Sequence, residues 1–194
     1  PGAQAGLECG SAALFCEGEG AAPVTVPEGS FSVPENGSES LRTGLETCPA
    51  GHFCIGGSRE ACEEGRSFQP LNGQANCISC SVCTAGSFVV EECTATSNRQ
   101  CEGCPAGRYQ NESGSATCLS CPKGHFCPPS ARSPSPCSEG ETWQDVEEQA
   151  TCKVCTTCSP GYSMSQTCTV TQNRQCEVCS PGRYQSDLNA ESCD

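Results

Sequence analysis

Residues 62–101 read CEEGRSFQPLNGQANCISCSVCTAGSFVVEECTATSNRQC, and residues 137–176 read CSEGETWQDVEEQATCKVCTTCSPGYSMSQTCTVTQNRQC. In both segments 14, 2, 2, 9 and 7 residues separate six successive cysteines. Working outward, ten cysteines between 48 and 118 recur as ten between 121 and 193, offset by 73 residues for the first two pairs and by 75 for the other eight. Ten cysteines in register indicate a tandem duplication, with a two-residue insertion in residues 128–136.

The cysteines stand in place of an apolar core. Leu, Ile, Val and Phe make only 25 of the 194 residues and the net charge is −13, a composition typical of disordered chains. The 22 cysteines instead indicate a disulfide scaffold. A disulfide restricts the unfolded chain, which is worth about 3 kcal/mol for a 15-residue loop. The sequence therefore predicts a small disulfide-rich fold of mostly short β-strands and loops, forming an elongated tandem-repeat rod with little hydrophobic core.

The composition also predicts the compartment. Persistent disulfides need an oxidising environment, so we expect a secreted protein or a cell-surface ectodomain. Sequons at Asn36 and Asn111 predict N-linked glycan. There is no initiator Met, no signal peptide and no apolar run long enough to span a membrane, so we expect either that a signal has been removed or that this is a segment of a longer chain. The pattern stops one residue after Cys193, which favours a segment. An acidic surface with two Lys and eight Arg argues against nucleic-acid binding.

Three domains are expected: an N-terminal element at 1–47, repeat 1 at 48–120 and repeat 2, truncated, at 121–194. Residues 17–47 lack Cys and contain Asn36-Gly37, the dipeptide of a type I′ hairpin turn. They are interpreted as a poorly buried β-element, with disorder as the alternative. Nine of the ten aromatic residues follow a Gly within three positions, which predicts an aromatic ring covering each adjacent disulfide. The alternative is a stacking platform for sugar or nucleic acid.

Two family resemblances organise the cysteines. The stretch from Cys93 through Asn98-Arg99-Gln100 to Cys101 is similar to the cysteine-rich modules of the tumour necrosis factor receptor family. That resemblance implies the pairs Cys62–Cys77, Cys80–Cys93, Cys83–Cys101, Cys137–Cys152, Cys155–Cys168 and Cys158–Cys176.

The sequence Cys104-Pro105-Ala106-Gly107-Arg108-Tyr109 resembles the opening of the ephrin-receptor-like cysteine-rich module. It implies Cys104–Cys118 and Cys179–Cys193. The cysteines left over give the short-range pairs Cys9–Cys16, Cys48–Cys54 and Cys121–Cys127. Spacing alone does not fix connectivity, so a swap among Cys118, Cys121, Cys127 and Cys137 stays open.

Metal binding and catalysis have little support. The Cys-x2-Cys-x2-Cys runs at 77–83 and 152–158 suggest zinc, but disulfides are the stronger interpretation, and His52 and His125 are expected at the surface beside a cystine. Asp occurs only three times, and no oxygen-rich calcium loop is present. No catalytic constellation appears, so we expect no cofactor and no enzymatic activity.

Two functions fit these features. The first is a structural subunit, such as a stalk or a filament of a surface coat, matrix or flagellar hair, with other protein chains or further copies as partners and residues 17–47 joining the chains. The alternative is the ligand-binding or adhesion ectodomain of a cell-surface receptor, as the resemblances imply. The recurring cations that we would test as its contacts are Arg99, Arg174, Arg108 and Arg183, although their recurrence equally fits ion pairs inside each module.

Overall fold

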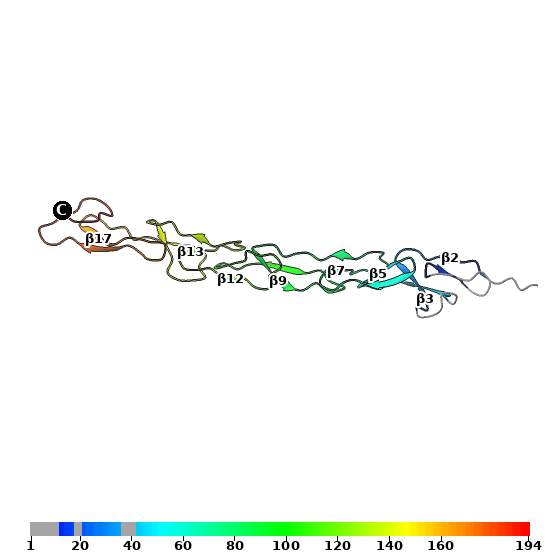
Figure 1. The fold of residues 1–194 in the computed structure, drawn as a ribbon. Helices are drawn as coiled ribbons and strands as arrows, with labels where there is room; N and C mark the ends of the chain where they lie inside the picture. The colour runs from blue at the N-terminus through cyan, green and yellow to red at the C-terminus, as the bar shows by residue number, and fades with distance from the viewer. Residues whose placement is uncertain (1–11, 18–20, 36–41) are drawn as a thin grey trace, which may run out of the picture. The chain divides into compact units, whose positions relative to one another are not determined.

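The fold is a succession of two-stranded β-sheets with no helix in the part of the chain described. The computed structural model describes residues 12–17, 21–35 and 42–194. Figure 1 shows the strand pairs following one another along the chain, each strand hydrogen-bonded to one other strand. The pairs are β1 (Leu14–Phe15) with β2 (Val24–Thr25), β3 (Ser30–Val33) with β4 (Gly44–Thr47), β5 (His52–Ile55) with β6 (Ser58–Ala61), β7 (Ser67–Phe68) with β8 (Ile78–Ser79), β9 (Ser87–Glu91) with β10 (Gln100–Gly103), β11 (Arg108–Tyr109) with β12 (Leu119–Ser120), β13 (His125–Phe126) with β14 (Ser135–Pro136), β15 (Thr142–Trp143) with β16 (Lys153–Val154), and β17 (Tyr162–Gln166) with β18 (Gln175–Val178).

Cystine sulfur forms most of the buried apolar interior. Among the described residues, the buried apolar side chains are cysteines except for Phe15, Phe31, Val89 and Ala131. Strands of two to five residues with so few apolar side chains are too short to be stable as isolated hairpins. The predicted disulfide-rich fold of short strands with little hydrophobic core is therefore confirmed.

Ten disulfides lie within the described residues. Their Cα–Cα distances run from 5.5 to 6.1 Å, within the usual range. They join Cys48–Cys54, Cys62–Cys77, Cys80–Cys93, Cys83–Cys101, Cys104–Cys118, Cys121–Cys127, Cys137–Cys152, Cys155–Cys168, Cys158–Cys176 and Cys179–Cys193. These are the pairs expected for residues 48–194. The expected Cys9–Cys16 bond stays a prediction, because Cys9 lies outside the described residues.

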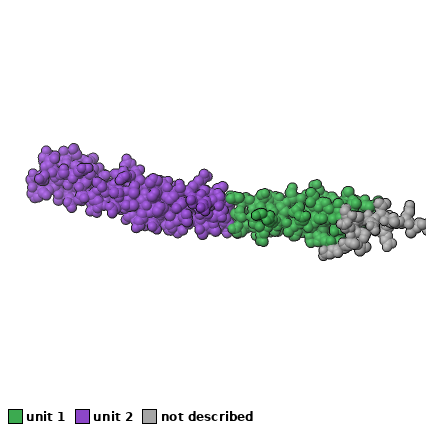
Figure 2. Space-filling view, viewed as in Figure 1, with its two compact units in different colours: residues 1–82, 91–100 green, residues 83–90, 101–194 purple. Residues whose placement is uncertain are grey.

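The chain divides into two compact units (Figure 2). The first comprises residues 1–82 and 91–100, and the second comprises residues 83–90 and 101–194. Each unit has a small cluster of its own around a buried disulfide. In the first, Phe31 packs with Cys48 and Cys54. In the second, Cys121 and Cys127 pack with Ala131, and the half-buried Tyr109 lies against them.

The Cys121–Cys127 loop connects the segments before and after it within the second unit. Gly107 accepts a backbone hydrogen bond from Cys121 at 2.9 Å and donates one to Cys127 at 2.8 Å. On the other side, Glu148 donates to the carbonyl of Cys121 at 2.8 Å and the amide of Cys127 donates to Gln149 at 2.9 Å. A short cystine loop bonded on both sides in this way connects neighbouring modules by backbone hydrogen bonds, in addition to the packing of Tyr109 against the cystine.

The same connection occurs in the first unit, where Gly29 takes the place of Gly107. Gly29 accepts from Cys48 at 2.9 Å and donates to Cys54 at 3.0 Å, while Gly73 donates to Cys48 at 2.7 Å. The β3–β4 hairpin therefore occupies the place that β11–β12 has in the second unit, although no disulfide closes it. Sequence reasoning missed this equivalence, and its signal is Pro27-Glu28-Gly29-Ser30-Phe31 against Pro105-Ala106-Gly107-Arg108-Tyr109.

Four glutamines, each directly after an aromatic residue, stabilise the turns. Sequence reasoning did not single them out. Gln69, Gln110 and Gln144 are nearly completely buried, at 2, 5 and 2 % exposure. Each side-chain amide donates to a carbonyl seven residues on and accepts from the backbone NH two residues on. Gln185 makes the same bonds in a half-buried position. These side chains form hydrogen bonds with backbone groups of the turns, because buried polar groups are destabilising when they are left unpaired.

Aromatic packing on the disulfides is confirmed for part of the set only. Phe31 and Tyr109 lie against buried cystines, as predicted. Tyr162 and Tyr184 do not fit the prediction, because they are 44 and 68 % exposed.

Candidate functional site

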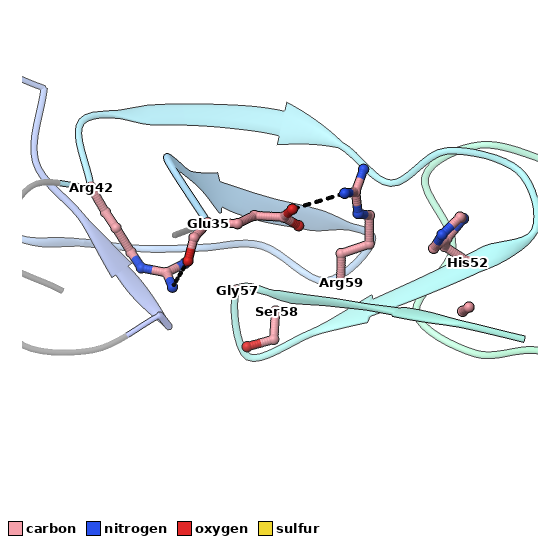
Figure 3. Close-up of a pocket in the computed structure, with 7 residues that line it drawn as sticks. Glu35, Arg42, His52, Gly57, Ser58 and Arg59 are labelled. Atoms are coloured by element: carbon pink, nitrogen blue, oxygen red, sulfur yellow. Dashed lines mark hydrogen bonds and ion pairs between the residues drawn. The ribbon is translucent and has the colours of Figure 1, made fainter. Parts of the chain in front are cut away.

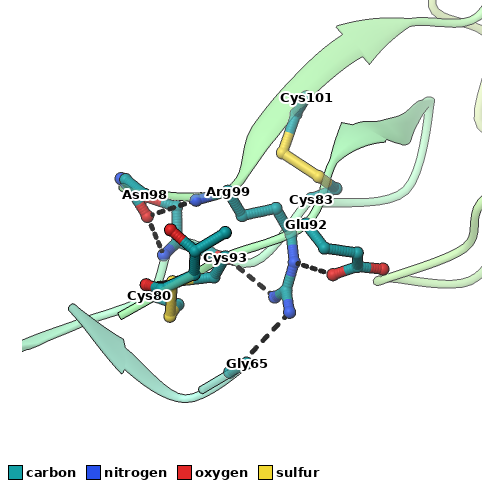
Figure 4. Close-up of polar contacts among 10 residues, drawn as sticks. Gly65, Cys80, Cys83, Glu92, Cys93, Asn98, Arg99 and Cys101 are labelled. Atoms are coloured by element: carbon teal, nitrogen blue, oxygen red, sulfur yellow. Dashed lines mark hydrogen bonds and ion pairs between the residues drawn. A yellow bond between two sulfur atoms is a disulfide. The ribbon is translucent and has the colours of Figure 1, made fainter. Parts of the chain in front are cut away.

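The recurring arginine Arg99 lies at the centre of a network inside the first unit (Figure 4). Its guanidinium donates to the carbonyl of Ser81 at 2.9 Å, to the carbonyl of Gly65 at 3.2 Å and to the Glu92 carboxylate at 3.1 Å. The side chain is only 16 % exposed. Arg99 therefore ties three segments of one module together, which agrees with the second interpretation of its recurrence, an ion pair inside the module, and not with an exposed ligand contact.

The neighbouring Asn98 completes this network. Its side-chain oxygen accepts from the backbone NH of Ser81 at 2.8 Å, and its amide donates to the Ser81 hydroxyl at 2.8 Å. The Asn-Arg pair thus holds the segment between Cys93 and Cys101 against Ser81, which directly follows Cys80. This explains in physical terms why Asn-Arg-Gln-Cys occurs in both repeats.

Arg174 repeats the network in the second unit with one partner missing. It donates to the carbonyls of Thr156 and Gly140 at 2.8 and 3.0 Å, matching the bonds of Arg99. Thr167 stands where Glu92 stands in repeat 1, and the buried Nε of Arg174 has no hydrogen-bond partner. Arg174 also donates to the side-chain oxygen of Asn189 at 3.0 Å, but its unpaired buried Nε still costs stability.

Glutamate at position 167 is expected to supply the missing partner. We expect Thr167→Glu to raise the free energy of unfolding by about 0.5–1 kcal/mol, because it pairs a guanidinium NH that is now unsatisfied. Denaturant unfolding followed by the fluorescence of Trp143, the single Trp, measures the change. Ser165→Glu, two residues earlier in β17, adds the same charge at a position that does not correspond to Glu92 and is expected to have no effect. Equal shifts in both variants would contradict the assignment.

The other two recurring arginines also bond within the chain. Arg108 forms an ion pair with Glu148 and donates to the carbonyl of Cys118 at 3.3 Å. Arg183 donates to the equivalent carbonyl of Cys193 at 3.1 Å. These bonds agree with the interpretation of the recurring arginines as partners inside the chain and not as ligand contacts.

A polar hollow in the first unit gathers charged residues that sequence reasoning had not singled out (Figure 3). It has a volume of about 420 Å³ and is lined by Glu35, Arg42, His52, Gly57, Ser58, Arg59 and Ala61. The guanidinium of Arg59 pairs with Glu35 at 2.8 Å and lies 4.8 Å from the centre of the Phe31 ring. A parallel bridge between Phe31 and Gly57 places the β3 and β6 hairpins side by side, which brings these residues together. No local motif signals a contact that depends on two hairpins meeting.

A second cation contacts an aromatic ring in the second unit. Lys153 lies 4.6 Å from the Trp143 ring and bonds to the Asp145 carboxylate at 2.6 Å. The hydrogen bond from Lys153 lowers the pKa of Asp145 below its ordinary value. These side chains are about half exposed, so the cluster is a surface feature rather than a binding cavity.

The remaining expected sites fall in different places. Asn111 is exposed, and its glycosylation stays a prediction, whereas Asn36 lies outside the described residues. His52 and His125 are half-buried at the start of strands that lead into a cystine. Within the ranges described, no group of three or more His, Cys, Asp and Glu side chains is placed to hold a metal ion, and no helix has the length and hydropathy needed to cross a bilayer.

Comparison with known families shows what the six-cysteine segments are. Residues 62–101 and 137–176 each match the family model described as the TNFR/NGFR cysteine-rich region. They are cysteine-rich modules of the tumour necrosis factor receptor type. Residues 92–137 match a model described as tyrosine-protein kinase ephrin type A/B receptor-like, so both expected module types are present. Modules of this kind with so many disulfides are extracellular, as the composition predicted.

This chain matches less than two thirds of the length of each of three relatives. Tumor necrosis factor receptor superfamily member 14 of Homo sapiens is 27 % identical over 171 residues, 80 % of this chain and 57 % of that protein. Member 23 of the same superfamily from Mus musculus is 34 % identical over 88 residues, 41 % of this chain and 49 % of that protein. The mouse signal peptide, CUB and EGF-like domain-containing protein 3 is 30 % identical over 163 residues, 81 % of this chain and only 15 % of that protein.

Among solved structures, the human RANKL/OPG complex shows 21 % identity and a TM-score of 0.27, with 61 % of this chain and 76 % of that chain covered. The matches to the TNFR/NGFR cysteine-rich region and to two members of the tumor necrosis factor receptor superfamily agree better with the receptor ectodomain, which the sequence placed second, than with the structural filament that it placed first.

Proposed function

We propose that this chain is part of the ligand-binding ectodomain of a cell-surface receptor and that it recognises a protein ligand without catalysis. The observation that carries the proposal is the twofold match to the TNFR/NGFR cysteine-rich region, at 62–101 and 137–176. Two relatives are named as members of the tumor necrosis factor receptor superfamily. The disulfide-held modules present short loops and strand edges on a scaffold with few internal degrees of freedom, and such surfaces lose little entropy on binding.

The ligand surface is expected to use side chains that the modules do not need for themselves. Arg99 and Arg174 are occupied by backbone carbonyls, so replacing them would disturb the fold rather than a contact. Exposed apolar residues such as Val82, 62 % exposed, and Val90, 52 % exposed, are available to a partner. The arginine-lined hollow of the first unit is available as well.

A binding screen tests the proposal. The oxidised chain is immobilised and exposed to a panel of soluble tumour necrosis factor-family ligands, ephrins and other secreted or cell-surface proteins. We expect saturable binding of at least one panel member at submicromolar concentration, lost when the chain is reduced and alkylated. Sedimentation velocity on the same material gives the second readout. Regular polymers that grow with concentration, together with no ligand, would contradict the proposal and restore the structural interpretation.

A further inference from the structure

The arginine-lined hollow carries an inference about the chemistry of the ligand, and this inference rests on the proposed function. The geometry points to a subsite in which Arg42 and Arg59 receive the carboxylate of an Asp or Glu side chain from the protein partner (Figure 3). The two guanidinium groups come from different hairpins and line one hollow. Such a pair matches a carboxylate in charge, and each planar group matches its two oxygens in geometry.

Arg42 is held in place and carries a charge that no described carboxylate neutralises. Its guanidinium donates to the Ser32 carbonyl at 3.1 Å, to the Ser32 hydroxyl at 2.9 Å and to the Glu35 carbonyl at 3.3 Å. All three acceptors are neutral, and within the ranges described Arg42 takes part in no ion pair. A half-buried, fixed and unpaired positive charge in a chain of net charge −13 is a local attraction for an anion.

Arg59 shows how a carboxylate sits in the hollow. It pairs with Glu35 at 2.8 Å, and both side chains are about one-third exposed, at 35 and 34 %. Ion pairs at such exposure are worth about 0–1 kcal/mol, so a better-placed carboxylate from a partner displaces Glu35 at little cost. The Phe31 ring beneath Arg59 limits the positions of the guanidinium and keeps it directed into the hollow.

The charge of the whole chain favours a protein carboxylate over a sulfated polysaccharide. An extended polyanion meets the repulsion of a net charge of −13 over its whole length. A single carboxylate on a protein meets only the local field, because more distant charges are screened within about 8 Å at physiological salt. The hollow, at about 420 Å³, holds one or two side chains rather than a polymer segment.

An NMR titration with the capped peptide Gly-Asp-Glu-Asp-Gly tests the subsite on the oxidised chain. We expect saturable shifts in the Nε–H signals of Arg42 and Arg59, and none with the capped peptide Gly-Asn-Gln-Asn-Gly. Arg42→Gln is expected to weaken peptide binding about tenfold, whereas Glu35→Gln is expected to tighten it about threefold because it removes the internal competitor. Arg66→Gln is the control, since Arg66 is 78 % exposed and lies outside the hollow, and it is expected to change nothing.

Several outcomes would overturn the inference. Unchanged affinity in Arg42→Gln, or no tightening in Glu35→Gln, shows that the arginines do not receive the peptide. If a heparin hexasaccharide binds more tightly than the acidic peptide, the ligand of the subsite is a sulfated glycan and not a protein carboxylate. The proposed function fails separately: a panel ligand that binds wild type and Arg42→Gln equally refutes the subsite but supports the receptor role. Arg42-dependent peptide binding without any panel ligand supports the subsite and refutes that role.

Discussion

Alanine at both Cys121 and Cys127 is expected to lower the free energy of unfolding of the second unit by about 3–5 kcal/mol. Both cysteines are completely buried, and their cystine is the centre of the cluster with Ala131 and Tyr109. Its loop also carries the four backbone hydrogen bonds to Gly107, Glu148 and Gln149. Losing the disulfide therefore removes a covalent link, the local core and a connection between modules together. Denaturant unfolding followed by Trp143 fluorescence measures the loss.

The matched control replaces both Cys179 and Cys193 by alanine. The disulfide between these two cysteines closes a longer loop. Its sequence separation is 14, against 6 for Cys121–Cys127. If loop entropy alone decided stability, removing the longer loop would cost more, because the entropic benefit grows with loop length. We expect the opposite order, since Cys179 and Cys193 are only half-buried. Losses that follow loop length would show that the buried cystine cluster contributes little.

Gly107→Ala is expected to cost at least about 3 kcal/mol, because this glycine combines a left-handed backbone with a close approach to another module. Its φ is 84°, and a Cβ built at Gly107 would lie 2.1 Å from the carbonyl oxygen of Glu148. That oxygen belongs to backbone, so it cannot rotate away as a side chain would. The variant must either separate the modules or distort the turn.

Gly182→Ala separates these two effects. Gly182 has the same place in the second repeat and φ of 86°, but a Cβ there would meet nothing within 4 Å. Gly182→Ala therefore loses only the free energy of placing alanine in a left-handed backbone conformation, about 1–2 kcal/mol. Equilibrium unfolding of both variants and limited proteolysis around residue 148 give the comparison. Equal losses would mean that the contact between Gly107 and Glu148 does not hold the modules together.

Sequence was most informative where cysteine supplies the structure. The spacing of Cys62, Cys77 and Cys80 recurs in the second repeat and carries the family resemblance, and that resemblance implied the disulfide pairs, since spacing alone does not fix connectivity. The composition predicted the short-strand fold and the extracellular compartment, and the cysteine motifs predicted the two module types. The sequence did not decide between the two functions, because stalks and receptors can be built on the same scaffold and differ in their surface side chains.

Features that depend on meetings between hairpins could not be predicted. The β3–β4 hairpin resembles β11–β12 in its place and its bonds, yet it has Val26 where the other has Cys104, so cysteine counting passes over it. Arg42 and Arg59 are brought to one hollow by the bridge between Phe31 and Gly57 rather than by sequence spacing. Recurrence left two roles open at Arg99, because a residue that stabilises each module recurs in the same way as one that binds a ligand.

The most direct test of the account is full reduction of the wild-type chain without denaturant, followed by two-dimensional amide NMR. The account predicts that the dispersed amide signals of β-structure collapse to those of an unfolded chain once the disulfides are reduced, because the buried interior is almost entirely cystine. Alkylation and mass measurement confirm that reduction is complete. A fully reduced chain that keeps its dispersed spectrum would show that interactions other than disulfides hold the modules together. That result would contradict the claim that cystines replace a hydrophobic core.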